Sequence, residues 1–173
     1  SGTYETSEFY QYALIAEKTG DSEKDEKEIA KIAAEANRVK AAKDTEEFVR
    51  LIREEYAENA MEKAREQYYE AFYQSMSSTY SGEELERAVN ERLKTVAEGF
   101  LDEAINAIHE TNVTFDRAYR LGGKDFTDWL YGGEAGEGAI RSVVTEDETS
   151  YYIILVCLIK APEKDEKELY SVG

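Results

Sequence analysis

Four glycines lie close together directly after the only tryptophan of the chain: Gly132, Gly133, Gly136 and Gly138. Glycine-rich loops bind phosphate when they connect a strand to a helix, because the free amides of the helix N-terminus then meet the anion. Here the glycines follow a predicted helical turn and precede a predicted strand, and neither G-x-G-x-x-G nor G-K-[ST] occurs. The loop therefore predicts a chain reversal that uses glycine at positive φ, and no nucleotide site.

The side chains that perform nucleophilic or metal chemistry are scarce. His109 is the only histidine and Cys157 the only cysteine, which excludes an internal disulfide and a Cys-x-x-Cys metal site. A Glu-x-x-His metal pair would need an acid at position 106, which is Asn106. We expect His109 to be a surface or helix-capping residue and Cys157 a small buried one. No catalytic, metal-binding or cofactor-binding residue is predicted, and the chain is interpreted as non-enzymatic.

The charge of the chain limits its partners. Its 173 residues include 38 acidic and 21 basic ones, a formal charge of −17. Nucleic acid is bound by clustered lysine and arginine, so we expect no nucleic-acid partner. An acidic surface keeps a protein soluble and is compatible with basic or partly unfolded polypeptide partners.

A group of aromatic and methionine residues is the strongest candidate for a binding surface. These residues are expected near one end of a long helix: Tyr68, Tyr69, Phe72, Tyr73, Met76 and Tyr80. Tyrosine and methionine offer large, adaptable contact areas to other polypeptides. The alternative is that they pack against a neighbouring helix, as helical spacing alone would suggest. Since Tyr69, Tyr73 and Tyr80 cannot all face the same helix as Tyr68 and Phe72, some of the six are expected to be exposed.

The elements that must carry these residues begin with a helical hairpin from about residue 44 to 110. Asp44 stands three residues before Glu47, as in a capping box, and nothing interrupts a helix from there to about Ser75. After the turn "SSTYSGEE", a second apolar stripe begins at Leu85 and continues to Ile108. Two long helices joined by a short turn must run antiparallel.

The remaining segments predict a small sheet and shorter helices. Residues 6–18 predict a short amphipathic helix, and residues 139–160 predict a β-hairpin. Since two strands are marginal in water, a third is expected, with "ELYSV" at 168–172 as the candidate. The predicted fold class is α+β and predominantly helical: a long antiparallel helical hairpin plus short helices packed on a small C-terminal antiparallel β-sheet. Residues 1–162 are expected to form one module, and 163–173 a linker to a further domain.

Residues 124–156, "KDFTDWLYGGEAGEGAIRSVVTEDETSYYIILV", resemble a segment of the parvulin-type peptidyl-prolyl isomerases, the PrsA- and SurA-like extracytoplasmic foldases of bacteria. In that family a Phe-x-x-Trp turn and a glycine–acid loop lead into a strand, and a second strand begins with paired aromatics. Residues 35–57 are similar to the family's lysine-and-alanine helix followed by D-x-x-x-F. The matching positions are Phe126, Trp129, Leu130, Gly136, Glu137, Val143, Val144, Tyr151, Tyr152 and Ile153.

The resemblance implies an extracytoplasmic parent, secreted or anchored as a lipoprotein. A parvulin active site would open with a strand carrying His-Ile-Leu, have a second histidine near its end, and include a "GGDLG" run. This sequence has only His109 and, in place of that run, "YGGEAGEG". We therefore expect a non-catalytic, chaperone-like region that holds unfolded polypeptides beside a catalytic domain following Gly173. The alternatives are a degenerate or active isomerase fragment, and a structural or dimerisation module.

Overall fold

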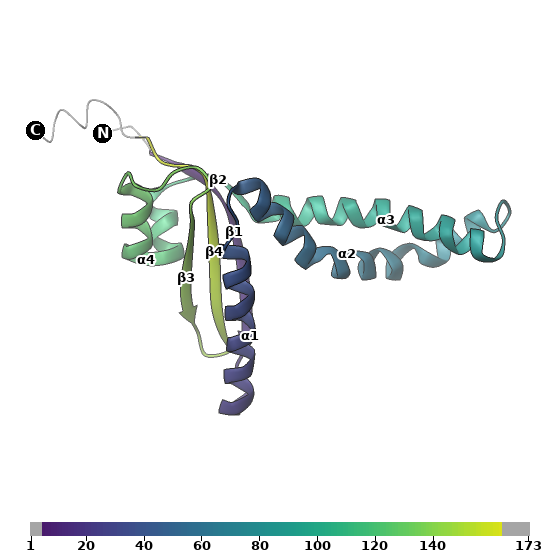
Figure 1. Cartoon of the computed structure of the whole chain (residues 1–173), viewed down its shortest axis with the longest axis horizontal. Helices are drawn as coiled ribbons and strands as arrows, with labels where there is room; N and C mark the ends of the chain where they lie inside the picture. The colour runs from purple at the N-terminus through teal and green to yellow at the C-terminus, as the bar shows by residue number, and fades with distance from the viewer. Residues whose placement is uncertain (1–4, 164–173) are drawn as a thin grey trace, which may run out of the picture. The chain divides into compact units, whose positions relative to one another are not determined.

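The computed structural model describes residues 5–163, which form eight helices and strands (Figure 1). In chain order they are β1 (Ser7–Glu17), α1 (Ser22–Lys40), α2 (Thr45–Met76), α3 (Gly82–Ala107), β2 (His109–Val113), α4 (Phe115–Tyr131), β3 (Ile140–Glu146) and β4 (Ser150–Lys160). The predicted α+β, mostly helical fold class is confirmed.

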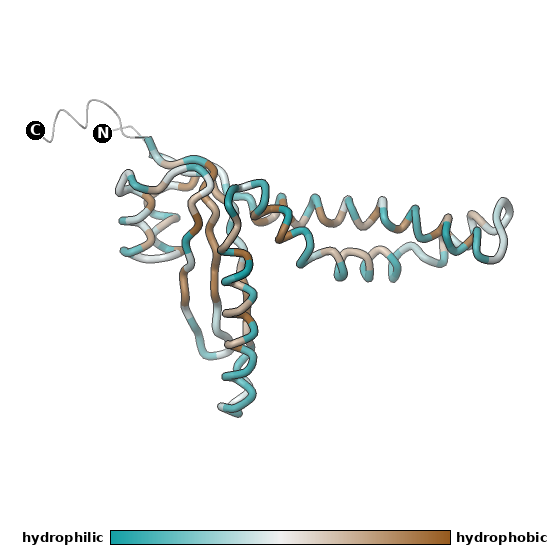
Figure 2. Tube along the Cα trace, viewed as in Figure 1, coloured by the Kyte–Doolittle hydropathy of each residue, from teal (hydrophilic) through white to brown (hydrophobic). Residues whose placement is uncertain are grey.

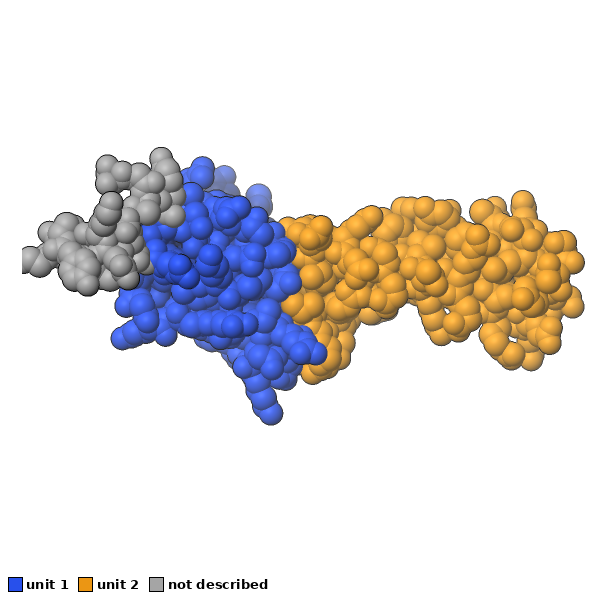
Figure 3. Space-filling model, turned by 90° about the horizontal axis from the view of Figure 1, so that it is seen from above, with its two compact units in different colours: residues 1–48, 108–173 blue, residues 49–107 orange. Residues whose placement is uncertain are grey.

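The chain divides into two compact units, coloured separately in Figure 3. The sheet unit comprises the described residues up to Phe48 and from Ile108 onward, and the hairpin unit comprises residues 49–107. Helix α2 begins in the first of these and continues into the second.

The sheet unit is built on four antiparallel strands in the order β2-β1-β4-β3. Strands β1 and β4 are paired over almost their whole length, from Glu8 opposite Lys160 to Glu17 opposite Ser150. The predicted β-hairpin at 139–160 is present as β3 and β4. In Figure 2 both of these strands are brown along much of their length, as expected for the apolar interior of a sheet.

The strand that completes the sheet corrects the prediction of a helix at residues 6–18. That segment is β1, so the sheet combines strands from both ends of the described chain and is not confined to its C-terminal part. The candidate strand at 168–172 lies outside the described residues. Buried Phe9, Tyr12 and Ala16 have the three-and-four spacing of a helical stripe, which is why the sequence was misleading.

Both faces of the sheet are covered, and this explains the spacing on β1. Phe9 lies on the face that packs against α4, where its ring meets the edge of Phe126 at a centroid distance of 6.1 Å. Even-numbered β1 residues lie on the opposite face, where Tyr10 stacks on Phe48 at 6.5 Å and where α1 packs against β1 and β4. Because buried residues come from two faces, they do not alternate along the strand.

Cys157 lies on the α1 face and is completely buried, as predicted. Its sulfur lies 3.8 Å from the Thr45 hydroxyl oxygen. Burial raises the pKa of the thiol, which keeps it in the unreactive neutral form.

The hairpin unit contains the predicted pair of long helices, α2 and α3, joined by residues 77–81. In its core, small buried residues of α2 pack against larger buried residues of α3. The buried members are Ala60, Ala64, Leu85, Val89, Leu93, Ala97 and Leu101. The capping prediction at Asp44 is confirmed in part: its carboxylate accepts from the Glu47 amide at 2.8 Å, while Glu47 accepts from the Lys43 amide instead of that of Asp44.

Candidate polypeptide-binding surface

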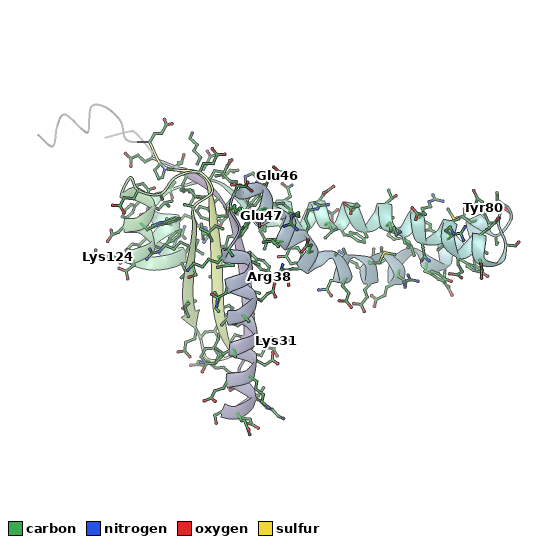
Figure 4. The ribbon with its side chains drawn as sticks, in the orientation of Figure 1. Lys31, Arg38, Glu46, Glu47, Tyr80 and Lys124 are labelled. Carbon is green, nitrogen blue, oxygen red and sulfur yellow. The ribbon has the colours of Figure 1, made fainter. Side chains whose placement is uncertain are left out.

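The six predicted binding residues all lie on the last three turns of α2 or in the turn that follows, at the tip of the hairpin. Tyr80, labelled in Figure 4, lies in that turn, where its amide donates to the Met76 carbonyl at 2.9 Å. Helix α2, which contains no glycine or proline, carries this group away from its first residue, Thr45.

The structure divides the six residues into two sets. Tyr68, Tyr73 and Tyr80 are exposed, with 38%, 40% and 42% of their surface accessible. Tyr69, Phe72 and Met76 are half-buried against the core between α2 and α3. The expectation that some of the aromatics are exposed is therefore confirmed, and the others belong to the packing of the hairpin.

Two residues exchange the positions that their spacing suggested. Tyr68 was expected to face α3 and is exposed, whereas Tyr69 packs against the core. Tyr69 also makes a polar contact across the hairpin: its hydroxyl donates to a Glu86 carboxylate oxygen at 2.7 Å. That hydrogen bond raises the pKa of Tyr69. Helical spacing alone does not reveal the contact with Glu86.

The exposed and half-buried rings form two short rows. Tyr68 stacks on Phe72 at 5.4 Å between centroids, and Tyr69 lies beside Tyr73 at 5.9 Å. Both are i,i+4 pairs, which are neighbours on a helix surface. The Arg92 guanidinium lies over the Phe72 ring, 4.5 Å from its centroid. Phe72 thus has two partners, while Tyr73 is exposed to solvent.

Two shallow hollows meet at Tyr73. One, of about 310 Å³, is lined by Tyr69, Glu70, Tyr73, Gln74 and Glu86. The other, of about 770 Å³, is lined by Tyr73, Gly82, Glu83, Glu86, Arg87, Asn90, Glu91 and Lys94. Since Tyr73 and Glu86 line both, we treat them as one feature, the tyrosine groove.

The tyrosine groove is acidic. Its carboxylates are Glu70, Glu83, Glu86 and Glu91. Its cations are Arg87 and Lys94, and the Lys94 ammonium already pairs with Glu91 at 3.2 Å. A surface of this kind provides ring faces for apolar groups and carboxylates for lysine or arginine.

The glycine loop performs the conformational role predicted for it. Gly133 and Gly138 have φ of 84°. The Gly138 amide donates to the Leu158 carbonyl of β4 at 2.7 Å, and the Ala139 amide donates to the Gly136 carbonyl at 3.0 Å. These amides hold the loop against the sheet and are not available to a phosphate.

His109 is placed differently from the prediction. It lies on strand β2, half-buried, and not on a helix. Its ring lies 5.0 Å from that of Tyr10, and its Nε2 atom is 3.4 Å from a Glu8 carboxylate oxygen. The short strand β2 follows α3 after a single residue, so the apolar stripe of α3 extended the predicted helix too far.

Within residues 5–163, no cluster of three or more histidine, cysteine, aspartate or glutamate side chains is arranged to hold a metal ion. The described helices also include none with the length and apolar character of a membrane span. In comparisons with known proteins, no family model, curated protein or solved structure matches the chain.

Proposed function

We propose that the chain is a non-catalytic polypeptide-binding module, a chaperone-like region that holds unfolded segments of other proteins in the tyrosine groove. The observation that carries the proposal is the exposure of Tyr73 at the junction of two hollows, beside carboxylates from both α2 and α3. The resemblance to extracytoplasmic foldases supports the same proposal and implies a parent protein that is secreted or membrane-anchored.

The composition of the groove indicates its preferred clients. Exposed tyrosine rings contact apolar and aromatic side chains without requiring a fixed partner geometry. The four carboxylates favour segments that also carry lysine or arginine. We therefore propose basic, partly apolar segments of unfolded proteins as clients.

Suppression of client aggregation tests the proposal. Reduced lysozyme is a suitable basic client and reduced α-lactalbumin an acidic one. We expect the chain to delay aggregation of the basic client more strongly. We expect Tyr73→Ala to weaken client binding by about tenfold, the usual effect of removing an exposed aromatic anchor.

The matched control is Tyr119→Ala. Tyr119 is an exposed tyrosine of α4, with 51% of its surface accessible, and it lies in the sheet unit. If the control variant lost as much holding activity as Tyr73→Ala, or if neither lost any, the tyrosine groove would not be the client site.

A second candidate function is that of a peptidyl-prolyl isomerase-like module. One observation favours it: β1, the first described strand, pairs with β4, the last described strand. The paired aromatics Tyr151 and Tyr152 follow Ser150 at the start of β4. In the family that the chain resembles, one active-site histidine lies on the first strand of the active site. A second histidine lies near its end. Here both strands lack histidine, and His109 lies on β2.

A prolyl isomerisation assay separates the two candidates. Uncatalysed isomerisation takes tens to hundreds of seconds at about 25 °C, so even slow catalysis is measurable. The holding function predicts no acceleration with a proline-containing peptide. Acceleration that disappears in His109→Ala would favour the isomerase candidate.

A further inference from the structure

The outer edge of β1 is only partly occupied. On that side β1 pairs with the short strand β2 through Ser7, Phe9 and Tyr10, and the Gln11 amide donates to the Ile108 carbonyl at 2.8 Å. Beyond Gln11, no strand among the described residues continues the pairing on this side, although β1 extends to Glu17.

The direction of the free backbone groups follows from the strand pattern. Backbone N–H and C=O groups of alternate residues point to the same side of a strand. The Gln11 amide points to the β2 side, and the Lys18 amide points to β4, where it donates to the Thr149 carbonyl at 2.8 Å. The amides and carbonyls of Ala13, Ile15 and Glu17 must therefore point outward along the open edge.

The side chains at this edge leave it accessible. Ala13 is exposed, and Ile15 has 53% of its surface accessible. A hollow of about 660 Å³ lies alongside, lined by Ile15, Glu17, Thr19, Lys24, Lys27 and Glu28. It joins the last part of β1 to the first turns of α1.

Two cations, Lys24 and Lys27, line this hollow beside the carboxylates of Glu17 and Glu28. Both lysines are exposed on α1, and neither ammonium group has an ion-pair partner within residues 5–163. A strand added to the edge would direct alternate side chains toward α1, and thus toward these two lysines.

We infer that the open edge of β1 is a second polypeptide-binding site, which takes an extended segment of a partner protein by strand addition. Its backbone pairs with Ala13, Ile15 and Glu17, and its side chains alternate between apolar residues on the Ile15 side and carboxylates facing Lys24 and Lys27. Main-chain pairing supplies the affinity and the lysines the selectivity. The site is separate from the tyrosine groove and does not depend on the function proposed for it.

Peptide binding to the full chain tests the inference, with two fluorescein-labelled decapeptides as probes, one of alternating valine and glutamate and one of alternating valine and lysine. Binding at the edge is followed through the amide resonances of Ala13, Ile15 and Glu17, because the lysine peptide is also a candidate client of the tyrosine groove. At low salt we expect the glutamate peptide to bind this edge about tenfold more tightly, the combined effect of two exposed charge pairs. The double variant Lys24→Glu, Lys27→Glu should reverse the preference. Both substitutions are at exposed positions, so folding is retained.

Backbone pairing has its own controls. N-methylation of the amides along one edge of the glutamate peptide should abolish binding, and the same number of methyl groups along its other edge should not. The amide resonances of Ala13, Ile15 and Glu17 should shift on titration. Equal binding of the two peptides, or no effect of N-methylation, would overturn the inference, as would a sedimenting dimer that the peptide cannot dissociate, because a second copy would then occupy the edge.

Discussion

Gly122 and Gly123 illustrate how single residues shape this fold. Gly123 interrupts α4 with φ of 71° and ψ of −159°, a conformation open essentially to glycine alone. The Thr127 hydroxyl donates to the Gly123 carbonyl at 2.7 Å and stabilises the kink. The kink allows Phe126 and Leu130 to reach the core on the β1–β4 face.

Gly122→Ala is expected to destabilise the sheet unit by roughly 1–3 kcal/mol, the usual cost of overpacking a core. An added Cβ atom would lie 2.5 Å from Cβ and 2.6 Å from Cγ of Phe126, which is only 1% exposed and cannot move aside. Chemical denaturation measures the change. Gly136→Ala is the matched control, since a Cβ atom there would meet nothing within 4 Å, and its effect should be close to zero. Equal effects of the two substitutions would contradict the packing explanation.

Asp147 organises the turn between β3 and β4. Its carboxylate accepts from the Tyr152 hydroxyl at 2.8 Å, and from the amides of Thr149 and Ser150 at 2.8 Å each. These hydrogen bonds, that from Tyr152 first, lower the pKa of Asp147 from 3.8 to about 2. The same contact raises the pKa of Tyr152.

This pKa shift predicts a pH dependence of stability. Because the folded-state pKa is below the unfolded value, the stabilisation is complete above pH 3.8 and is lost as the pH falls to about 2. Asp147→Asn should therefore unfold at a lower temperature than the wild type at pH 7, and the difference should shrink between pH 4 and pH 2. Thermal unfolding across this range gives the measurement. Glu148→Gln removes a neighbouring charge without these hydrogen bonds, and a similar pH profile in that variant would refute the assignment to Asp147.

At the scale of elements, the two ends of strand β1 differ in burial on the α4 side of the sheet. Phe9 and Ile15 are both odd-numbered residues on the α4 side of the sheet, but Phe9 is fully buried against Phe126 and Ile15 is largely exposed. On this side of the sheet, the beginning of β1 therefore belongs to the core. Its end is exposed, and this is also the part of β1 that β2 does not pair with.

Alanine substitutions along β1 should report this division. Phe9→Ala is expected to cost about 3–5 kcal/mol, because it removes a fully buried ring. Ile15→Ala is expected to cost less than about 1 kcal/mol, the range of strand preference at an exposed position. Urea denaturation followed by the fluorescence of Trp129, which packs against the same core, compares the two.

In the hairpin unit, helix α2 contributes both to the core and to the exposed surface near the tip. Its core is continuous from Ala60 to Met76 on α2, yet the same helix presents Tyr68 and Tyr73 to solvent. Near residue 53 the outer surface is held by ion pairs: the Arg53 guanidinium lies 2.8 Å from Asp102 and 2.6 Å from Glu98. Near the tip, aromatic rings take that place.

At the scale of the whole molecule, the charge of −17 is the dominant property. Like charges repel one another in the compact state, and salt screens this repulsion. We expect the unfolding temperature at pH 7 to rise by a few degrees between roughly 10 mM and 500 mM sodium chloride. At pH 4.5, near the isoelectric point, the same titration should have little effect. A decrease with salt at pH 7 would mean that attractive pairs such as those of Arg53 outweigh the repulsion.

Oligomeric state bears on the remaining alternative, a dimerisation module. If the tyrosine groove holds clients, light scattering at low salt should report a monomer, and Tyr73→Ala should not change the mass. A dimer that dissociates in Tyr73→Ala would instead assign the exposed rings to a subunit interface.

Local patterns determined much of this protein from the sequence alone. The helical hairpin, its turn, the β3–β4 hairpin and the buried Cys157 all depend on contacts between residues near in sequence, or on continuous apolar patterns. The glycine loop was predicted correctly for the same reason, since positive φ is a local requirement.

Tertiary structure alone decided the identity of β1, the place of His109 and the exchange of Tyr68 with Tyr69. Each depends on partners distant in sequence: β4 for β1, Tyr10 and Glu8 for His109, and Glu86 for Tyr69. Burial on two faces of a sheet produces a helix-like spacing, and the partner of Tyr69 comes from another helix. The periodicity of a segment does not show which distant element it will contact.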